Sequence, residues 1–328
     1  MTRSVLRAAV VAGALGWLAP SPAAPQARVL VVSGLGGEPQ YAERFRRWGA
    51  TIADAARAVP GARAEDVVFL AEDAAAADGI STLAEVEKAF TRLASRTPAE
   101  PLLVVLIGHG AADGRGARVN LPGPDLTAAA LATLLDAAGD GRLAVVVASS
   151  SSGAFLQPLA APDRVVVTAT RAAGERQAAR FPAHFAEAYA GDDADTDKDG
   201  RVSLLEAFRY AEAEVAREFQ AAGQLQTEHP VLDDDGDGSG SEADGNVAAA
   251  FFLGGAGRGT DDAAEIAAAS GRERELLEER ARIESEVDAL KARKDALAPD
   301  DYDAALEALF VRLALNARAL RLERGESP

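Results

Sequence analysis

The chain has 328 residues, of which 48% are apolar and only 5% aromatic, and it carries a formal net charge of -17. This length suits one α/β domain of about 200 to 250 residues with an appendage. The acidic balance argues against a nucleic-acid partner, which needs a basic face, and favours cations as ligands. Because the chain has no cysteine, disulfides, thiolate metal sites and a cysteine nucleophile are excluded.

Residues 1–27 have the order of a secretory signal peptide. Two arginines precede an apolar run from Ala8 to Leu18, and prolines and small residues follow it. This run is too short to span a bilayer stably. We expect cleavage between Ala23 and Ala27, export to the bacterial periplasm or the exterior, and no transmembrane anchor in the mature chain. An ordinary N-terminal helix is the alternative.

Residues 28–253 alternate short apolar runs with amphipathic segments. The runs are rich in Val, Leu and Ile without alternation, which is typical of strands buried on both faces of a parallel sheet. The amphipathic segments between them indicate crossover helices. We therefore expect an α/β fold with a mostly parallel, doubly wound sheet of about six strands. The expected strands are 28–33, 66–70, 101–109, 143–149, 164–170 and, as a sixth, 247–253; the expected helices are 40–58, 81–95, 126–135 after an Asp125 cap, and 181–190.

The C-terminal part has a different composition. A glycine-rich linker at 254–262 leads to a charged region at 263–324 with apolar residues at helical spacing, interrupted by Pro299. The positions that recur are Leu276, Ile283, Leu290 and Leu297, then Tyr302, Leu306, Leu309, Leu313, Asn316 and Leu320. This pattern predicts an antiparallel helical hairpin or short coiled coil. Its seam is narrow, so we expect it to pack on the domain or on a second copy as a homo-oligomer.

Residues 195–206 fit a twelve-residue EF-hand loop. Oxygen ligands would come from Asp195, Asp197 and Asp199 at positions 1, 3 and 5, from the Arg201 carbonyl at 7, through water on Ser203 at 9, and from Glu206 at 12. Gly200 at position 6 supplies the sharp turn, and the helix expected at 204–222 would leave the loop. The sequence therefore predicts a Ca²⁺ site; a solvated acidic turn is the alternative.

A second acidic run at 233–244 repeats part of this spacing. Asp233, Asp235 and Asp237 take positions 1, 3 and 5, and Asp244 takes position 12. Position 8 is a glycine, and no exiting helix is expected. The run is therefore either a second metal site or an acidic linker.

Polar residues end two of the expected strands. His109 lies between two glycines after one strand, and Ser149–Ser152 follow the next strand. Since sites in open α/β sheets form at the carboxyl ends of the strands, the imidazole and a serine hydroxyl can meet there. Thr170 and Arg171 end a further strand at the same edge. Arg171 and Glu175 are candidate pocket walls, and Arg171 favours an acidic partner.

The segments Gly-His-Gly at 108–110 and Ala-Ser-Ser-Ser-Ser-Gly at 148–153 resemble the catalytic segments of caspase-like cysteine peptidases, closest to the legumain branch. The resemblance implies that His109 stands where the family has its base and Ser150 where it has its nucleophilic cysteine. Backbone groups of Gly110 and Ser150 would then form an oxyanion hole. The resemblance spans about 28–253 in strand order, although only the two short motifs are specific.

A serine in place of the thiolate favours an inactive peptidase homologue that acts as a scaffold or binding module for a peptide or protein partner, because a hydroxyl needs a well-placed base to become nucleophilic. The alternative is a serine hydrolase that uses a Ser150/His109 dyad. A third interpretation is a coiled-coil adaptor in which the α/β domain is only an anchor.

Overall fold

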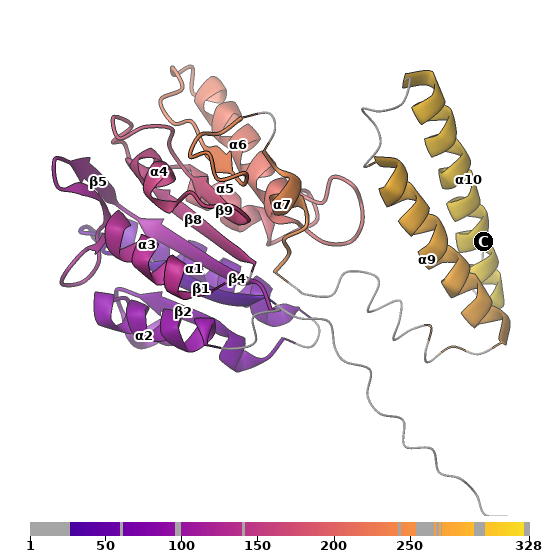
Figure 1. Ribbon diagram of the computed structural model, residues 1–328, viewed down its shortest axis with the longest axis horizontal. Helices are drawn as coiled ribbons and strands as arrows, with labels where there is room; N and C mark the ends of the chain where they lie inside the picture. The colour runs from indigo at the N-terminus through magenta and orange to yellow at the C-terminus, as the bar shows by residue number, and fades with distance from the viewer. Residues whose placement is uncertain are drawn as a thin grey trace, which may run out of the picture.

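A computed structural model describes residues 27–59, 62–95, 100–139, 142–241, 244–253, 266, 269, 271–291 and 299–324. The first 26 residues of the expected signal peptide and the whole expected linker at 254–262 lie outside the described residues. Helices cover both faces of a central sheet (Figure 1). Within the described residues, no helix is both long and apolar enough to cross a membrane.

The central sheet has seven strands in the order β10-β9-β8-β4-β1-β2-β3. Every neighbouring pair is parallel except β10 and β9, which are antiparallel. This confirms the predicted α/β fold with a mostly parallel, doubly wound sheet. The strands are β1 (Arg28–Ser33), β2 (Val67–Ala71), β3 (Gly79–Ile80), β4 (Leu102–Gly108), β8 (Leu143–Ser149), β9 (Arg164–Thr168) and β10 (Val231–Asp233).

The strand predicted at 247–253 is wrong. Residues Asn246–Ala249 form a short helix, α7, and Phe252 makes only an isolated bridge to Ser203. The buried Asp234 explains the difference, because its carboxylate accepts hydrogen bonds from the amides of Val247 and Ala248 at the start of α7. The edge of the sheet is filled instead by β10, an antiparallel strand whose run of three residues is too short to predict.

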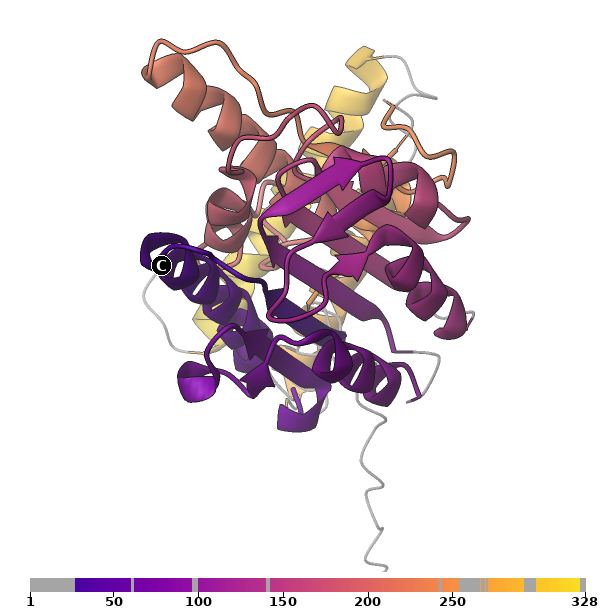
Figure 2. The same ribbon diagram turned by 90° about the vertical axis from the view of Figure 1, so that its left-hand side faces the viewer.

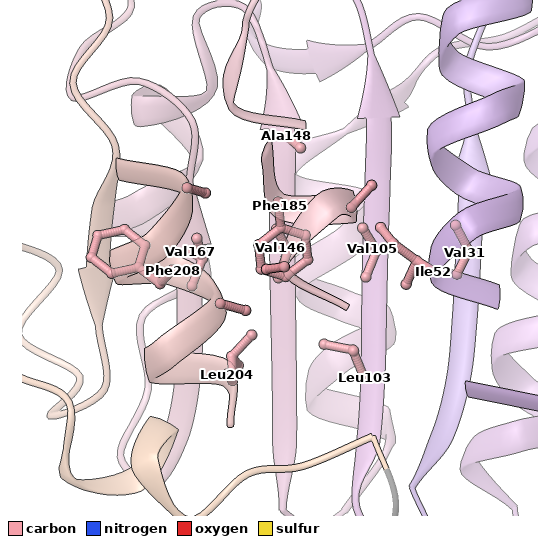
Figure 3. Close-up of a cluster of buried hydrophobic side chains, with 14 of the residues drawn as sticks. Val31, Ile52, Leu103, Val105, Val146, Ala148, Val167, Phe185, Leu204 and Phe208 are labelled. Atoms are coloured by element: carbon pink, nitrogen blue, oxygen red, sulfur yellow. The ribbon is translucent and has the colours of Figure 1, made fainter. Parts of the chain in front are cut away.

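The helices form two layers, each with its own apolar cluster. On one face lie α1 (Pro39–Ala58), α5 (Phe181–Ala188) and α6 (Leu204–Ala221). Figure 3 shows side chains from the strands of this face against Phe185 and Phe208. The other face carries α2 (Leu83–Ala94), α3 (Ala128–Ala137) and α4 (Leu156–Leu159). Strand residues alternate between these clusters, which is why the strands are apolar throughout.

The start of α3 differs from the prediction. Its N-cap is Thr127, whose hydroxyl accepts a hydrogen bond from the amide of Ala130 at 3.1 Å. Asp125 instead accepts from the amide of Leu121 within the preceding turn. Either residue type can cap a helix, and the turn before α3 decides between them.

A second sheet, of three strands, projects beyond the end of β4. It contains β5 (Gly110–Asp113), β6 (Gly116–Val119) and β7 (Leu126–Thr127), paired antiparallel. Figure 2 faces this sheet, drawn in magenta. It lies at the carboxyl edge of the central sheet and follows His109 directly, so it forms one wall beside the candidate site.

The C-terminal helices α9 (Gly271–Lys291) and α10 (Pro299–Glu323) pack against each other. Asn316 donates to the Leu276 carbonyl, Arg312 pairs with Glu279, and Arg324 pairs with Glu273. Residues later in α10 thus contact residues earlier in α9. The two helices therefore form an antiparallel hairpin, as predicted.

Candidate functional site

Strand order brings the two sequence motifs together. β4 and β8 are neighbours in register, with Gly108 opposite Ser149, so His109 and Ser150 leave the sheet side by side. β1 lies between β4 and β2. The chain adds β2 and β3 on one side of β1, and it adds β4, β8 and β9 on the other side. The site therefore lies next to a topological switch point, the place where open α/β sheets bind ligands.

Ser150 is bound to the backbone of Gly110 rather than to His109. Its hydroxyl donates to the Gly110 carbonyl at 3.0 Å and accepts from the Gly110 amide at 3.1 Å. Its side chain is buried, as are those of Ser149, Ser151 and Ser152. The Gly110 amide, one of the two donors expected for an oxyanion hole, is therefore already occupied by the Ser150 oxygen.

The His109 ring points toward α1 and the loop after β1. Its centroid lies 4.7 Å from that of Tyr41 and 5.0 Å from that of Phe45, with edge-to-face geometry in both pairs. Burial lowers the pKa of His109, while a hydrogen bond to the Gly36 backbone and the charge of Glu38 act in the opposite direction. No hydrogen bond between His109 and Ser150 is found among the described residues, so the two motifs are adjacent without forming a dyad.

The loop that contains the serines is fixed to the end of β9. The Ser152 hydroxyl accepts from the Thr170 amide at 3.0 Å, and the Thr170 hydroxyl accepts from the Gly153 amide at 2.9 Å. Ser151 has φ 55°, in the left-handed region. A Cβ on Gly153 would lie 2.2 Å from the backbone carbon of Arg171. Close backbone packing alone therefore requires the glycine that follows the serines.

The same kind of contact explains the glycine after His109. A Cβ on Gly110 would lie 2.5 Å from the carbonyl oxygen of Ser150 and 2.6 Å from the hydroxyl of Ser149. Gly110 and Gly153, two of the three glycines that contribute to the family resemblance, thus have a packing role here, independent of catalysis.

A Glu175–His229 pair, which the sequence did not reveal, supports the serine loop. One carboxylate oxygen of Glu175 lies 2.8 Å from His229 Nδ1, and the other accepts from the amides of His229 and Arg171. The Glu175 carbonyl accepts from the Ser151 amide. The two residues are 54 positions apart, and no local pattern predicts their contact. Only the short, unpredicted strand β10 places His229 at this edge.

Glu175 also lines a cavity of 490 Å³ beside the site. Tyr41, which contacts His109, and Thr170 form part of its wall, with Arg180, Phe219 and Glu228 farther along. The guanidinium of Arg180 lies 3.9 Å from the centroid of the Phe219 ring. Arg171, the other expected pocket residue, is exposed and borders a separate cavity of 640 Å³ between α6 and β10.

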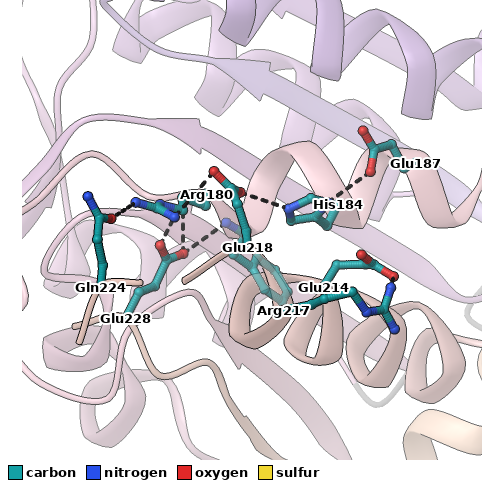
Figure 4. Close-up of polar contacts among 9 residues, drawn as sticks. Arg180, His184, Glu187, Glu214, Arg217, Glu218, Gln224 and Glu228 are labelled. Carbon is teal, nitrogen blue, oxygen red and sulfur yellow. Dashed lines mark hydrogen bonds and ion pairs between the residues drawn. The ribbon is translucent and has the colours of Figure 1, made fainter. Parts of the chain in front are cut away.

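Polar contacts join α5 to α6 at the far side of this cavity (Figure 4). The two ring nitrogens of His184 lie 2.8 Å from Glu187 and 3.1 Å from Glu218. Glu218 also pairs with Arg180. Glu228 accepts from the amides of Arg180 and Phe181 at the start of α5, and burial raises the pKa of its carboxyl. These contacts fix α6, which begins in the predicted calcium loop.

The loop at 195–206 is folded by its own carboxylates. Asp195 accepts from the amides of Asp199 and Gly200, Asp197 accepts from Asp199, and Asp199 accepts from Arg201. One oxygen from each of Asp195, Asp197 and Asp199 lies within 4.8 Å of the others. The three carboxylates therefore converge on one point, as a hard cation requires.

Glu206 crosses from the start of α6 to the start of the loop. One oxygen accepts from the amide and hydroxyl of Thr196, and the other from the amide and hydroxyl of Ser203. Burial acts to raise the pKa of Glu206, but these hydrogen bonds outweigh it and lower the pKa. Ser203 is the N-cap of α6 in a capping box with Glu206, so both residues assigned to late ligand positions also have a structural role.

Like charges affect the middle of the loop. Burial raises the pKa of Asp199; Arg201 opposes this shift, and the charges of Asp197 and Asp195 add to it. A divalent cation would offset this unfavourable concentration of negative charge. The donor set, all oxygen and mostly carboxylate, suits calcium better than a transition metal.

The second acidic run shares three of the internal hydrogen bonds of the first loop. Asp233 accepts from the Gly238 amide, Asp235 from Asp237, and Asp237 from Ser239, which matches the first loop position by position. One oxygen from each of these three aspartates again lies within 4.8 Å of the others. Asp244 closes the loop by accepting from the amides of Asp234 and Ser241. Burial raises the pKa of Asp233.

Comparisons with known proteins give little further information. No protein-family model matches the sequence, and no curated protein matches it. Among solved structures, the crystal structure of the Drosophila initiator caspase Dronc is similar, with a TM-score of 0.42 and 11% identity. That match covers 71% of this chain and 94% of Dronc. Similarity at this level does not bear on the residues of the site.

Proposed function

We propose that this protein is an exported, calcium-binding domain of caspase-like or legumain-like type that lacks peptidase activity and acts as a scaffold or binding module. The observation that carries the proposal is the bonding of Ser150. Its hydroxyl donates one hydrogen bond to the Gly110 carbonyl and accepts another from the Gly110 amide. Among the described residues, no base lies within hydrogen-bonding distance of this hydroxyl. Without a base, a serine hydroxyl is a poor nucleophile at neutral pH.

A serine hydrolase remains the second candidate, supported by the adjacency of His109 and Ser150 at the carboxyl edge. Labelling with a fluorophosphonate serine probe separates the two. We expect no labelling of the mature protein in calcium, with circular dichroism to verify its fold. Labelling that disappears in Ser150→Ala but persists in the neighbouring Ser149→Ala would replace the scaffold proposal with the hydrolase.

The chain offers a further test because it contains no cysteine. Ser150→Cys introduces a single thiol at the position where the resembled family has its nucleophile. A base beside it would lower its pKa well below the ordinary value of about 8.5, whereas a buried thiol without a base has a raised pKa. We expect the raised value, measured from the pH dependence of alkylation. A thiol ionised near neutral pH, or new cleavage of peptide substrates, would contradict the absence of a base.

Calcium binding is supported by the converging carboxylates of residues 195–206 and, in the second loop, of residues 233–244. We propose that the ion has a structural role, since the first loop leads directly into α6 and Ser203 bridges to Phe252 near the end of the domain. An ion that binds only the folded state stabilises it by mass action.

Calorimetric titration with calcium, with magnesium as the competing ion, tests the proposal. The double variant Asp195→Asn with Asp199→Asn should remove the first site, and Asp233→Asn with Asp237→Asn the second. Asparagine keeps one acceptor oxygen and can still accept one of the backbone hydrogen bonds that each aspartate accepts, and circular dichroism verifies that each variant folds. No heat of binding and no calcium-dependent rise in melting temperature in wild type would contradict the assignment.

Export is proposed from residues 1–27 alone. Expression of the full chain in a bacterium, followed by fractionation and N-terminal sequencing, tests it directly. We expect a mature chain that begins between residues 24 and 28. Full-length protein confined to the cytoplasm would exclude an active signal.

A further inference from the structure

The outward surface of α10 carries exposed apolar side chains. Among the described residues, six large apolar side chains are classed as exposed, and four of these belong to α10. They are Phe310 at 49%, Val311 at 52%, Leu315 at 62% and Leu322 at 56% exposure. Single exposed apolar residues are ordinary on a protein surface, but a concentration on one helix marks a contact surface.

Three of these four side chains form a second apolar face on α10. At 3.6 residues per turn, Val311, Leu315 and Leu322 lie within about 40° of one another around the helix axis. Asn316 and Leu320, the buried residues that face α9, lie on the opposite side of the helix. A helix that only completes a two-helix hairpin needs a single apolar face. The second one is therefore left to bind something else.

Two charged residues on this outward face make no ion pair with a residue that the structure describes. Glu307 and Arg318 flank Val311 and Leu315 on the same side of α10, and the described part of the chain records no ion pair for either one. By contrast, Arg312, on another side of α10, pairs with Glu279 and Glu286 of α9. The outward face thus carries one acidic group and one basic group, eleven residues apart by subtraction of 307 from 318.

The two charged residues of the outward face have opposite signs and lie at opposite ends of it. Glu307 lies nearer the start of α10, and Arg318 lies nearer its end. Two parallel copies in register would place like charges together. Two antiparallel copies place Glu307 of each copy against Arg318 of the other, so the face is complementary to itself under a two-fold axis.

We propose that the outward face of α10, formed by Val311, Leu315 and Leu322 with Glu307 and Arg318, binds the same face of a second copy in an antiparallel pair. A two-fold axis between residues 312 and 313 places Glu307 opposite the partner's Arg318. The two hairpins then form a four-helix arrangement with the α10 helices at its centre. This inference does not depend on the proposed calcium sites or on the state of Ser150.

The test is sedimentation of the mature full-length chain across a range of concentrations. We expect a dimer for wild type and a monomer for Leu315→Glu, which places a carboxylate in the contact. Leu225→Glu is the matched control, since Leu225 is exposed at 87% outside the hairpin. Its substitution should leave the dimer intact. Because both side chains are exposed, neither substitution should disturb the fold, and circular dichroism verifies that each variant is folded.

Charge reversal tests the antiparallel geometry. Glu307→Arg alone and Arg318→Glu alone should each weaken the dimer by roughly tenfold or more, since each change turns an attraction into a repulsion on both sides of the axis. The double variant should recover wild-type affinity. A monomeric wild type, a dimer that survives Leu315→Glu, or a double variant weaker than either single variant would each overturn the proposal.

Discussion

The imidazole of His229 lies 2.8 Å from the carboxylate of Glu175, although the two residues are 54 positions apart. The same carboxylate accepts from the backbone amides of His229 and Arg171, and the Glu175 carbonyl accepts from Ser151. One residue thus ties the serine loop, the loop after β9 and the segment before β10 together. The most connected polar residue at the carboxyl edge is therefore Glu175, and neither His109 nor Ser150 takes part in its contacts.

Replacing Glu175 should destabilise the fold more than replacing an equally charged residue elsewhere. Glu175→Ala removes three accepted hydrogen bonds at a side chain that is 18% exposed, and should lower the free energy of unfolding by about 2 kcal/mol. Glu187→Ala is the control, because its side chain is 58% exposed and its contact with His184 should contribute less than about 1 kcal/mol. Urea denaturation measures the free energy of unfolding of both variants. Equal losses would refute the idea that the hydrogen bonds of Glu175 hold the three segments together.

Gly153 should tolerate no side chain. A Cβ there would lie 2.2 Å from the Arg171 backbone and 2.4 Å from the Ala172 amide. The nearest atoms belong to the peptide group between these two residues, so no flexible side chain can move aside. We expect Gly153→Ala to destabilise the domain by about 1–3 kcal/mol. Gly174→Ala, a nearby position with open space around the added carbon, should have a smaller effect. Thermal unfolding checks both variants, and an unaffected Gly153→Ala would show that the loop can move away.

The sequence predicted those parts of the fold that depend on burial. β1 has the expected ends, and α1 and β2 differ by one residue, because an unbroken apolar run or a regular apolar stripe leaves few alternatives. The two errors at the edge of the sheet have another origin. Residues 247–253 are apolar enough for a strand, but Asp234 reaches from β10 to cap a helix there. Because these residues are thirteen positions apart, their contact produces no local pattern in the sequence from which the helix could be predicted.

The site shows the same division. Adjacency of His109 and Ser150 followed from strand order, since neighbouring parallel strands end at one edge. The direction of each side chain did not follow, because it depends on Tyr41 and Phe45 for the imidazole and on the Gly110 backbone for the hydroxyl. Sequence motifs therefore predicted which residues meet at the edge, while packing decides which of them bond.

His109 should titrate at a lower pH than an ordinary histidine. Burial lowers its pKa, so its imidazole should be neutral at neutral pH. Below the ordinary pKa of about 6.5, the unfolded state takes up the proton first, and stability falls until the lowered folded pKa is reached. His109→Gln should remove the part of the acid-induced loss of folding stability that comes from this imidazole. The chain has only three histidines, so NMR titration of their ring protons resolves each one. A His109 pKa at or above 6.5 would contradict the effect of partial burial.

Replacing Asn316 with leucine should increase the stability of the helical hairpin. It is buried in the hairpin seam, and its amide donates to the Leu276 carbonyl at 2.9 Å. Its buried side-chain oxygen, however, accepts no hydrogen bond from the residues that the structure describes. A polar residue in a helical seam fixes register at a cost in stability. Asn316→Leu should therefore stabilise the hairpin by about 1 kcal/mol or more, because the unpaired acceptor disappears.

Hydrogen exchange at α9 and α10 in the full chain measures this gain, with Asn316→Asp as the matched variant. The Asn316→Asp substitution would bury a charge in the same place and should accelerate exchange, since an unpaired buried carboxylate costs more than an amide. Slower exchange in Asn316→Leu should be accompanied by a less uniform pairing of the helices, detectable as mixed cross-links between engineered cysteines at 276 and 320. Faster exchange in Asn316→Leu would instead mean that the hydrogen bond to Leu276 contributes more than the unpaired oxygen costs.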